Sequence, residues 1–473
     1  MTYREALSYL HSFLNFEKIS QFSYRRELNL KRMKAILSWF RNPQNQFRSV
    51  SIAGTKGKGS TAFFLERLLS SHGFRTGLYT SPHLSDFRER IRIGTEWIAK
   101  DDFSRLMSRI KRVVERRKKS IRRLGSITFF ELSTTLAFLY FEEQKIDWAV
   151  LEVGMGGRLD ATNVVKQSLS VITLIGMDHE EHLGHTLKLI AKEKAAIIKS
   201  SVPVICAEQK QEALKVIQTQ AKKYGAPVYL LNRDFRATKI KLHPNGSKFN
   251  FQFRALNETV ILRRSRRISA RRFFAALRMT RVSSDDRTKT QFNQLELALP
   301  GSFQVRNASV ALAAFESLAD RFGFHLKSHE VYDALRRRDW WGRFEIIKRG
   351  GITYILDSAH NPESIRAASE HVRRFFKRKT IVTIFGISRE KNARDLYAVL
   401  SQISDMMIIT KAPQPRSQDP KTLVEQIEPR GIYSMSASLR EALDLAQRIS
   451  EKKTVILITG SLFLVGEARK LLA

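Results

Sequence analysis

Cysteine, long apolar runs and acidic side chains are all scarce in this sequence. Its 473 residues include one cysteine, Cys206, so the chain cannot form an internal disulfide, which fits a reducing cytosol. No stretch of about 18 uninterrupted apolar residues occurs, and the first residues, MTYREALSYLHSFLNFEK, contain no signal-peptide core. We therefore expect a cytoplasmic protein without a membrane span.

The deficit of acidic residues leaves a large positive charge. There are 82 Lys and Arg against 46 Asp and Glu, for a net charge of +36, which fits nucleic acid, acidic small molecules or a generally basic proteome. Residues 105–123 carry ten basic side chains against one acid, with apolar residues at helical spacing, which predicts a solvated basic helix rather than a nucleic-acid groove. Residues 263–290 carry ten against two and differ from both flanks, which predicts an inserted, disordered loop.

Glycine is concentrated at one informative place, SVSIAGTKGKGSTAFFLERLL at residues 49–69. An apolar run precedes the glycines, and apolar residues at helical spacing follow them, so the pattern predicts a strand, a loop and a helix. Such a loop presents backbone N–H groups and a positive helix end to a phosphate, and Lys58 adds a charge. Gly59 separates Lys58 from Ser60, unlike GxxxxGK[ST], so this is a phosphate loop of a distinct type; the alternative is an ordinary glycine-rich turn. The expected nucleotide-binding residues here are Gly54, Thr55, Gly57, Lys58, Gly59, Ser60 and Thr61.

Strand and helix patterns alternate along most of the chain, which predicts an α/β fold with a mostly parallel sheet covered on both faces. Residues 226–299 instead contain short β-like runs that suggest a small antiparallel edge or subdomain. A second strand–helix series starts at 351–360 and predicts a smaller, Rossmann-like α/β domain. We expect an N-terminal P-loop domain over 1–342 and a C-terminal domain over 343–473.

Polar residues follow several of the predicted strands. Glu152 ends an apolar strand, where a carboxylate is costly unless it binds a metal or a partner, and Mg²⁺ needs such oxygen ligands; the alternative is a glutamate bonded to backbone. Asp178 and His179 end another strand, although a lone histidine there is more often structural. Ser81 could join a metal shell or cap a turn, and Lys194 could simply lie on a solvated helix face.

A further strand-end group contains Asp357 and His360, in ILDSAHNPES. A Ser–His–Asp nucleophile is the alternative here, but the chain has no G-x-S-x-G elbow.

In order and spacing these motifs resemble one family. GTKGKGS, TSPHL, FFE, EVGMGGRLDATN, DH, KEKAAIIK, LPGSFQVRNASVALAA, GRFE and DSAHNP look like folylpolyglutamate synthase/dihydrofolate synthase, within the ATP-dependent Mur ligase superfamily. The match runs from about residue 3 to the C-terminus and leaves out only the arginine-rich insert. Two departures exist: Lys56 stands where the family usually has Asn, which could alter nucleotide affinity, and DSAH replaces DGAH or DVAH.

The resemblance implies roles for single residues. Lys58, Ser60 and the loop amides would hold the ATP phosphates, with Lys58, Glu152, His179 and Lys194 as catalytic residues. Ser81 and Glu152 would bind one Mg²⁺, and Glu152 with His179 a second, while Lys194 matches a lysine that is carbamylated into a metal ligand; K⁺ is a further candidate ion. The other expected nucleotide contacts are Asn307, Arg343, Asp357 and His360, and the expected substrate contacts are Pro82, His83, Phe130, Glu131, Arg158 and Asp160.

The implied reaction is ATP-dependent addition of L-glutamate to dihydropteroate, folates or both, through an acyl phosphate, by a monomer without a specific nucleic-acid partner. No protein nucleophile is needed, and a site between domains requires closure. The alternatives are another Mur-type ligase, such as a UDP-muramoyl amino-acid ligase or cyanophycin synthetase, a basic P-loop ATPase that binds nucleic acid, and a catalytically inactive member. The GRLDATN motif looks like the bifunctional bacterial form.

Overall fold

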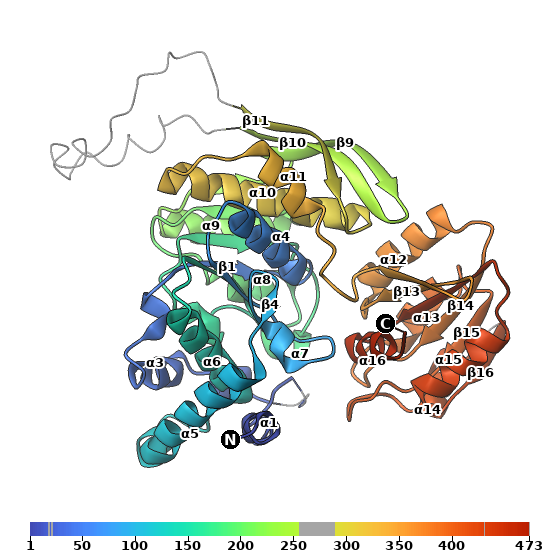
Figure 1. Ribbon diagram of the computed structural model, residues 1–473, viewed down its shortest axis with the longest axis horizontal. Coiled ribbons are helices and arrows are strands. Elements are labelled where there is room, and N and C mark those ends of the chain that lie inside the picture. The colour runs from blue at the N-terminus through green and yellow to red at the C-terminus, as the bar shows by residue number, and fades with distance from the viewer. Residues whose placement is uncertain (18, 20–21, 255–288, 430, 473) are drawn as a thin grey trace.

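The computed structural model describes residues 1–473 except 18, 20–21, 255–288, 430 and 473 (Figure 1). Within this range the strands form an eight-stranded, a three-stranded and a six-stranded sheet. The predicted α/β class is therefore confirmed. The predicted insert at 263–290 lies outside the described residues, apart from residues 289–290.

The eight-stranded sheet has the order β4-β3-β2-β5-β1-β6-β7-β8. As predicted, most of the sheet is parallel: β2, β5, β6, β7 and β8 run in the same direction as β1. Strands β3 and β4 add an antiparallel edge. The central strands are buried on both faces, which explains their unbroken apolar sequences. The strands are β1 (Arg48–Ala53), β2 (Thr76–Tyr79), β3 (Ile91–Ile93), β4 (Glu96–Trp97), β5 (Trp148–Glu152), β6 (Leu169–Ile172), β7 (Val204–Cys206) and β8 (Val228–Leu230).

Helices cover both faces of this sheet, because alternate strand residues point to opposite sides. Val150 packs with one group of helices and Leu151 with the other. The first face carries α4 (Lys58–Ser71), α10 (Ser302–Phe322) and α11 (Ser328–Leu335). The second carries α1 (Tyr3–His11), α3 (Leu30–Ser38), α5 (Lys100–Arg122), α6 (Phe129–Glu143), α8 (Leu187–Ala195) and α9 (Gln211–Lys223). Short helices α2 (Tyr24–Glu27) and α7 (Glu180–Leu183) lie in the connections.

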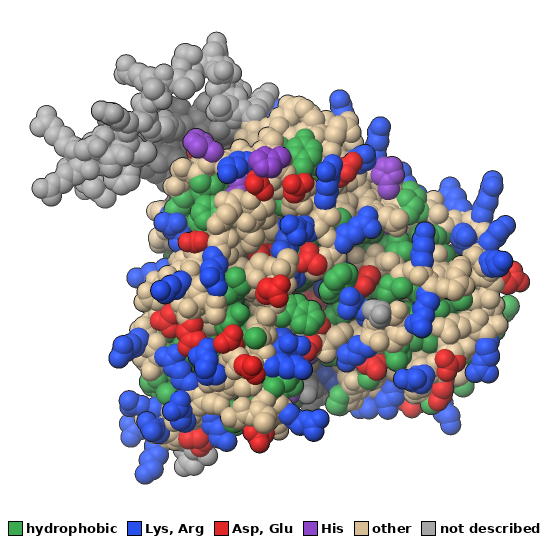
Figure 2. Space-filling model, in the orientation of Figure 1, with side chains coloured by type: hydrophobic (Ala, Val, Ile, Leu, Met, Phe, Trp, Pro, Cys, Tyr) green, Lys and Arg blue, Asp and Glu red, His purple; other side chains and the backbone are tan. Residues whose placement is uncertain are grey.

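The predicted basic helix is α5, which is 23 residues long. Its apolar stripe, including Phe103, Leu106 and Ile110, is buried in the core, and Arg105 and Arg109 pair with Glu143 of α6. Figure 2 shows that Lys and Arg side chains are scattered over this whole face of the molecule rather than gathered in one groove.

The three-stranded sheet is antiparallel, as the sequence predicts, with the order β11-β10-β9. It is formed by β9 (Phe235–His243), β10 (Gly246–Arg254) and β11 (Lys289–Leu297). Phe235, Phe249 and Phe251 join the core that contains α10, so this sheet covers α10 on the side away from the large sheet (Figure 1).

The six-stranded sheet has the order β12-β13-β17-β14-β15-β16, parallel except for the edge strand β12. Its strands are β12 (Glu345–Arg349), β13 (Ile352–Asp357), β14 (Thr380–Phe385), β15 (Met406–Ile409), β16 (Ile432–Met435) and β17 (Thr454–Thr459). The helices α12 (Pro362–Phe375), α13 (Ala393–Leu400) and α14 (Pro420–Ile427) cover one face, and α15 (Leu439–Arg448) and α16 (Leu462–Leu472) the other.

The segment that joins the two large sheets is anchored on the N-terminal side. Asp339 accepts hydrogen bonds from Arg67 of α4 (2.5 Å) and Arg92 of β3 (2.8 Å), and Trp340 stacks on Phe63 with ring centroids 5.2 Å apart. After this anchor the chain turns at Gly342, which has a left-handed φ of 67°. Among the helices that the structure describes, none combines the length and apolar composition needed to cross a membrane.

Candidate active site

A cavity of about 680 Å³ lies between the two large sheets and is lined from both sides. In α/β folds, loops at the carboxyl ends of parallel strands form such sites. Most of the residues predicted from sequence line it: Thr55, Gly57, Lys58, Gly59, Ser60, Ser81, Pro82, Phe130, Glu131, Glu152, Asp160, His179, Asn307, Arg343, Asp357 and His360. Gly54, Thr61, His83, Arg158 and Lys194 are not among the lining residues.

The phosphate loop connects β1 to α4 and is tied to the neighbouring strand connection. The N–H groups of Thr55 and Lys56 both donate to the carbonyl of Leu174, at 2.9 and 3.1 Å. Helix α4 begins at Lys58 with Gly57 as its N-cap, and no side chain caps it. The first-turn N–H groups of a helix have no partner within the helix, so this helix end can bind an anion.

The loop glycines are required by close packing. Gly57 has a φ of 82°, and a Cβ there would lie 2.2 Å from the Asn307 side-chain oxygen. A Cβ on Gly59 would lie 3.0 Å from the Trp340 ring and 3.2 Å from a carboxylate oxygen of Glu152. Asn307, Trp340 and Glu152 therefore surround the loop, and side chains within it would displace them.

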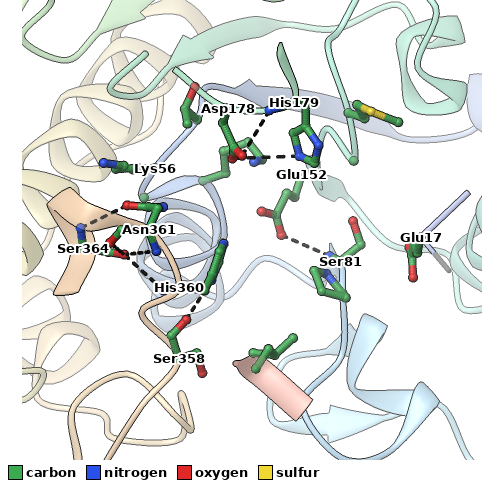
Figure 3. A pocket seen from close by; sticks show the side chains of 18 of the residues that line it. Glu17, Lys56, Ser81, Glu152, Asp178, His179, Ser358, His360, Asn361 and Ser364 are labelled. Atoms are coloured by element: carbon green, nitrogen blue, oxygen red, sulfur yellow. Dashed lines mark hydrogen bonds and ion pairs between the residues drawn. The ribbon is translucent and has the colours of Figure 1, made fainter. Parts of the chain in front are cut away.

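Glu152 ends β5 inside the cleft and is 6% exposed. Its Oε2 accepts a hydrogen bond from the backbone N–H of Ser81 at 3.1 Å, and Figure 3 shows the two residues facing each other. Burial raises the pKa of Glu152, although the positive charges of Lys58 and Arg343 oppose that rise. A buried carboxylate beside a phosphate loop fits a cation ligand better than a surface ion pair.

Asp178 and His179 lie on the same side of the cleft (Figure 3). His179 adopts a left-handed backbone with φ 52°, which is uncommon for a residue with a side chain and is frequent at functional sites. Desolvation lowers the pKa of His179 to about 4 against the opposing charge of Asp178, with nearby lysines adding to the fall, so the imidazole, 47% exposed, is neutral at pH 7 and able to act as a ligand. Burial favours the neutral form of Asp178, but the surrounding basic groups, including Lys391 at 3.6 Å, outweigh it and lower the pKa of Asp178.

Lys194 is 3% exposed on α8 and lies behind the phosphate loop. Its Nζ donates to the carbonyl of Gly54 at 2.8 Å. Burial, assisted by the charge of Lys58, lowers the pKa of Lys194 to about 7. The solvated helix face considered for this lysine is therefore wrong, because the side chain is enclosed.

The C-terminal part contributes the loop after β13. The Asp357 carboxylate accepts from the backbone N–H groups of Phe344 (2.9 Å) and Ala359 (3.0 Å), and burial raises its pKa to about 6. His360 Nδ1 lies 2.8 Å from the carbonyl of Ser358, and burial lowers its pKa to about 4. Both residues face the cleft together with Arg343.

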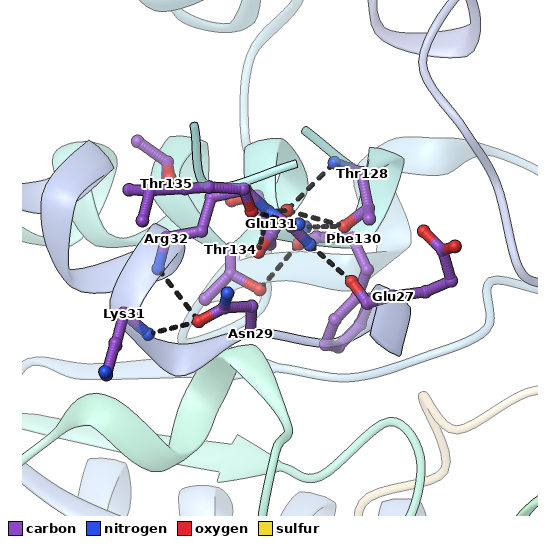
Figure 4. Close-up of polar contacts among 10 residues, drawn as sticks. Glu27, Asn29, Lys31, Arg32, Thr128, Phe130, Glu131, Thr134 and Thr135 are labelled. Carbon is purple, nitrogen blue, oxygen red and sulfur yellow. Dashed lines mark hydrogen bonds and ion pairs between the residues drawn. The ribbon is translucent and has the colours of Figure 1, made fainter. Parts of the chain in front are cut away.

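The FFE motif forms the start of α6, where Phe130 and Glu131 line the cleft. Glu131 caps this helix through Thr128 and binds Arg32 of α3, whose Nε lies 2.9 Å from both carboxylate oxygens (Figure 4). Arg32 also donates to the backbone carbonyls of Glu27 and Leu124, at 2.6 and 3.1 Å. Glu131 thus fixes the chain before α3 against α6, and its predicted substrate contact stays a prediction.

Three other predicted substrate residues have protein partners. Asp160 is buried and accepts from the N–H groups of Gly154 and Met155, at 3.0 and 3.1 Å, which shapes the glycine-rich turn. Arg158 pairs with Glu193 of α8 at 2.9 Å. His83 Nδ1 accepts from Arg90 Nε at 2.8 Å. Each of these contacts organises the wall of the site.

The described residues contain no cluster of three or more His, Cys, Asp or Glu side chains placed to hold a metal ion. Of the four predicted metal ligands, Ser81, Glu152 and His179 line the cleft, whereas Lys194 lies behind the phosphate loop; Glu152 is the one carboxylate among these four. A hydroxyl, a carboxylate and a neutral imidazole are chemically competent donors, and further oxygen ligands would come from phosphates or water.

Among the residues that sequence reasoning missed, Glu17, Lys391 and Arg416 line the cleft, and Arg90 binds Glu17 without lining it. Lys391 lies 3.6 Å from Asp178, and Arg416 donates to the carbonyl of Glu17 at 2.7 Å, so both reach from the C-terminal part to the N-terminal part. They follow the strands β14 and β15, and their place after strand ends was a signal that could have found them.

Comparisons with known proteins identify the family of this chain. The family model for the Mur ligase middle domain matches residues 52–315, and that for the Mur ligase glutamate ligase domain matches residues 342–462. The dihydrofolate synthase/folylpolyglutamate synthase of Bacillus subtilis is 30% identical over 472 residues, which cover 99% of this chain and 98% of that protein. This chain belongs to the folylpolyglutamate synthase/dihydrofolate synthase family of Mur ligases. It is accordingly an ATP-dependent ligase.

Solved structures of this family superimpose over the whole chain. Folylpolyglutamate synthase from Thermotoga maritima is 32% identical with a TM-score of 0.79, and the match covers 99% of this chain and 96% of that one. A folylpolyglutamate synthase complex with AMPPCP and folate is 28% identical with a TM-score of 0.79, covering 100% of both chains. That relative binds an ATP analogue and folate together.

Proposed function

We propose that this chain adds L-glutamate to dihydropteroate, to folates or to both, at the expense of ATP. The observation that carries the proposal is the buried Glu152 carboxylate beside the open end of α4, in a chain that is 30% identical over 472 residues to a dihydrofolate synthase/folylpolyglutamate synthase. These comparisons favour this ligase over another Mur-type ligase and over a nucleic-acid-binding ATPase.

The triphosphate of ATP would lie on the loop from Gly54 to Thr61. The unpartnered N–H groups at the start of α4 supply fixed dipoles, and Lys58 supplies a charge on the same turn. Asn307 and Arg343 line the adjacent wall of the cavity, where they can contact the nucleotide.

The donor set fits Mg²⁺, with Ser81 and Glu152 as ligands of one ion and Glu152 with His179 as ligands of a second. Bound Mg²⁺ would neutralise charge on the phosphates during transfer. Imidazole is not a preferred magnesium ligand, so the second position would be the less specific one. The predicted potassium ion stays a prediction.

Lys194 would become a carbamate. Its lowered pKa of about 7 leaves much of the amine neutral at physiological pH, and a neutral amine adds to CO₂ with loss of a proton. The resulting carbamate carries a negative charge and offers two oxygens, the ligand type that Mg²⁺ prefers. This modification also replaces the ammonium that now donates to Gly54.

In the reaction, a carboxylate oxygen of the pterin substrate would attack the γ-phosphorus of ATP, and ADP would leave. The amine of L-glutamate would then attack the acyl carbon, lose a proton and release phosphate. The loop amides and Lys58 stabilise the charge that develops on the phosphoryl group, while the cleft walls exclude water from the acyl phosphate. No side chain needs to act as a nucleophile.

The proposal includes a domain boundary near Gly342, where the chain leaves its anchor on α4. Cytoplasmic location, a monomeric state and the absence of a specific nucleic-acid partner stay predictions.

The decisive experiment measures ATP-dependent phosphate release with L-glutamate, using dihydropteroate and tetrahydrofolate in separate reactions. Release with either acceptor, together with the glutamylated product by mass spectrometry, supports the proposal and says which activities are present. Release with neither acceptor, from a folded protein that binds ATP, would contradict it.

A further inference from the structure

Two described stretches of the chain, residues 14–17 and 22–28, contribute residues to the wall of the cleft. We call residues 14–17 and 22–28 the strap; the cavity-lining members are Leu14, Asn15, Phe16, Glu17, Phe22 and Leu28. Leu14 is fixed by the bond from the Phe129 N–H to its carbonyl (2.9 Å). Beyond Leu14 this first part of the strap lies in no helix or sheet, so side chains must hold it.

The N-terminal part of the chain holds the strap through the carboxylate of Glu17. Both carboxylate oxygens of Glu17 accept from Arg90, at 2.7 and 2.6 Å. The Arg90 side chain is 1% exposed, and its guanidinium carbon lies 5.4 and 5.3 Å from the ring centroids of Phe87 and Phe129. Since its Nε also donates to His83, Arg90 is held in position by contacts that do not involve the strap.

The C-terminal part of the chain, on the other side of the cleft, holds the strap through the backbone carbonyl of Glu17. Arg416, in the loop between β15 and α14, donates from Nη1 to the backbone carbonyl of Glu17 at 2.7 Å. Glu390 forms an ion pair with the same guanidinium, and the Arg389 N–H donates to the Arg416 carbonyl at 2.9 Å, so the arginine is held in place by its own domain. Glu17 is therefore bound through its carboxylate by one part and through its carbonyl by the other.

From this arrangement we propose that Arg416 is a positioning residue that closes the strap over the acceptor substrate when the two parts are docked. The ion pair with Arg90 holds Glu17 to the N-terminal part through contacts that do not involve the C-terminal part. The hydrogen bond from Arg416 to the Glu17 carbonyl forms only when the loop after β15 reaches Glu17. It therefore links the order of the strap to closure of the cleft. This proposal rests on the proposed function, because it assigns the strap to the substrate that receives glutamate.

The test compares Arg416→Met, Arg416→Lys and the control Arg389→Met in the full chain. Arg389 is exposed in the neighbouring loop, between β14 and α13, and among the described contacts its side chain bonds only within the C-terminal part, to the Ser417 carbonyl. Loss of a charged donor is expected to raise the KM for the pterin acceptor about tenfold or more, with the KM for ATP and the melting temperature unchanged. Arg416→Lys retains a donor and should restore most of the affinity, and Arg389→Met should match wild type.

A second measurement does not depend on turnover. Hydrogen exchange in peptides covering residues 13–17 should slow when dihydropteroate or tetrahydrofolate binds to wild type with ATP, and should slow less in Arg416→Met. An unchanged acceptor KM with unchanged exchange in Arg416→Met overturns the proposal. An equal rise in the KM of ATP and acceptor, or a loss of stability, also overturns it, because Arg416 would then be structural. A wild type that shows the exchange effect but no ligation would instead contradict the proposed function alone.

Discussion

The two large sheets meet at the same cleft but equip it in different ways. The N-terminal sheet offers groups that are fixed and enclosed: the first turn of α4, the Glu152 carboxylate and the Lys194 side chain. The C-terminal sheet sends long side chains across the gap, with Lys391 to Asp178 and Arg416 to Glu17, while Glu363 of α12 pairs with Lys56 of the phosphate loop. In the proposed function the first sheet would supply the groups that act on the phosphates, and the second adds ion pairs and a hydrogen bond that reach across the cleft.

Cross-cleft contacts and buried groups should also differ in how much free energy they contribute. In the cross-cleft pairs the side chains are partly exposed, 21% and 50% for Lys56 and Glu363, and such pairs contribute about 1 kcal/mol or less. Removal of a buried group on the first sheet should therefore cost far more activity than removal of a cross-cleft contact. The following changes test that order from the largest effect to the smallest.

Lys58→Ala should abolish ligation while the fold is retained. The substitution removes a positive charge from the first turn of α4, where the phosphates would lie, and alanine is a good helix former. Phosphate release and the circular dichroism spectrum are the measurements. Full activity at saturating ATP would show that Lys58 does not act on the phosphates.

Glu152→Gln should lower kcat by about two to three orders of magnitude. It keeps the shape and the acceptor for the Ser81 N–H but removes the charge that a cation needs. The control is Glu208→Gln, which neutralises an exposed carboxylate after β7. A Glu152 variant with wild-type kcat and wild-type dependence on Mg²⁺ would make this residue structural.

Lys194→Arg should lose most activity, because arginine keeps a positive charge and does not form this carbamate. Lys194→Ala should also lose activity but regain part of it with small carboxylic acids or high bicarbonate. Since the pKa of Lys194 is about 7, the reactive neutral amine is lost as pH falls below 7, so wild-type activity should fall there and respond to added CO₂. A fully active Lys194→Arg enzyme would contradict the carbamate.

Lys391→Met should have a modest effect, a rise of about two- to fivefold in KM without loss of the fold. It deletes a contact of 3.6 Å to Asp178 from a side chain that is 24% exposed. Steady-state kinetics against both ATP and acceptor provide the measurement. A loss of activity as large as that of Glu152→Gln would contradict the expected difference between the two sheets.

Deletion of residues 265–288 should leave kcat and KM within about twofold of wild type. The strands that flank this stretch pair directly, with Arg254 opposite Lys289, so their ends already lie side by side. Activity and thermal unfolding are the measurements. A folded deletion variant without activity would show that the insert has a role.

The same contrast explains what the sequence could predict. Strand and helix periodicity is local, and so is the glycine pattern of the phosphate loop, which is why both sheets and the loop were found. Glu152 was found because a carboxylate at the end of an apolar strand is conspicuous by itself. The contacts of Glu131 with Arg32 and of Glu17 with Arg90 join residues 99 and 73 positions apart, and no local pattern predicts them.

The contact between Arg416 and Glu17 is the extreme case, at 399 positions apart. It depends on how the two parts dock, and docking is decided by a few side chains at loop tips rather than by periodicity. His83 shows how a motif residue can gain a role that the motif does not predict: its Nδ1 accepts a hydrogen bond from Arg90, while its substrate contact stays a prediction.

The indole of Trp340 lies against the phosphate loop, stacked on Phe63 and within 3.0 Å of the Cβ position of Gly59. Indole emission responds to changes in polarity and contact, and this ring sits where the nucleotide site meets the segment that joins the two sheets. The protein thus carries a built-in optical reporter. Substituting the other four of its five tryptophans with phenylalanine would leave one fluorophore that reports ATP binding without a label.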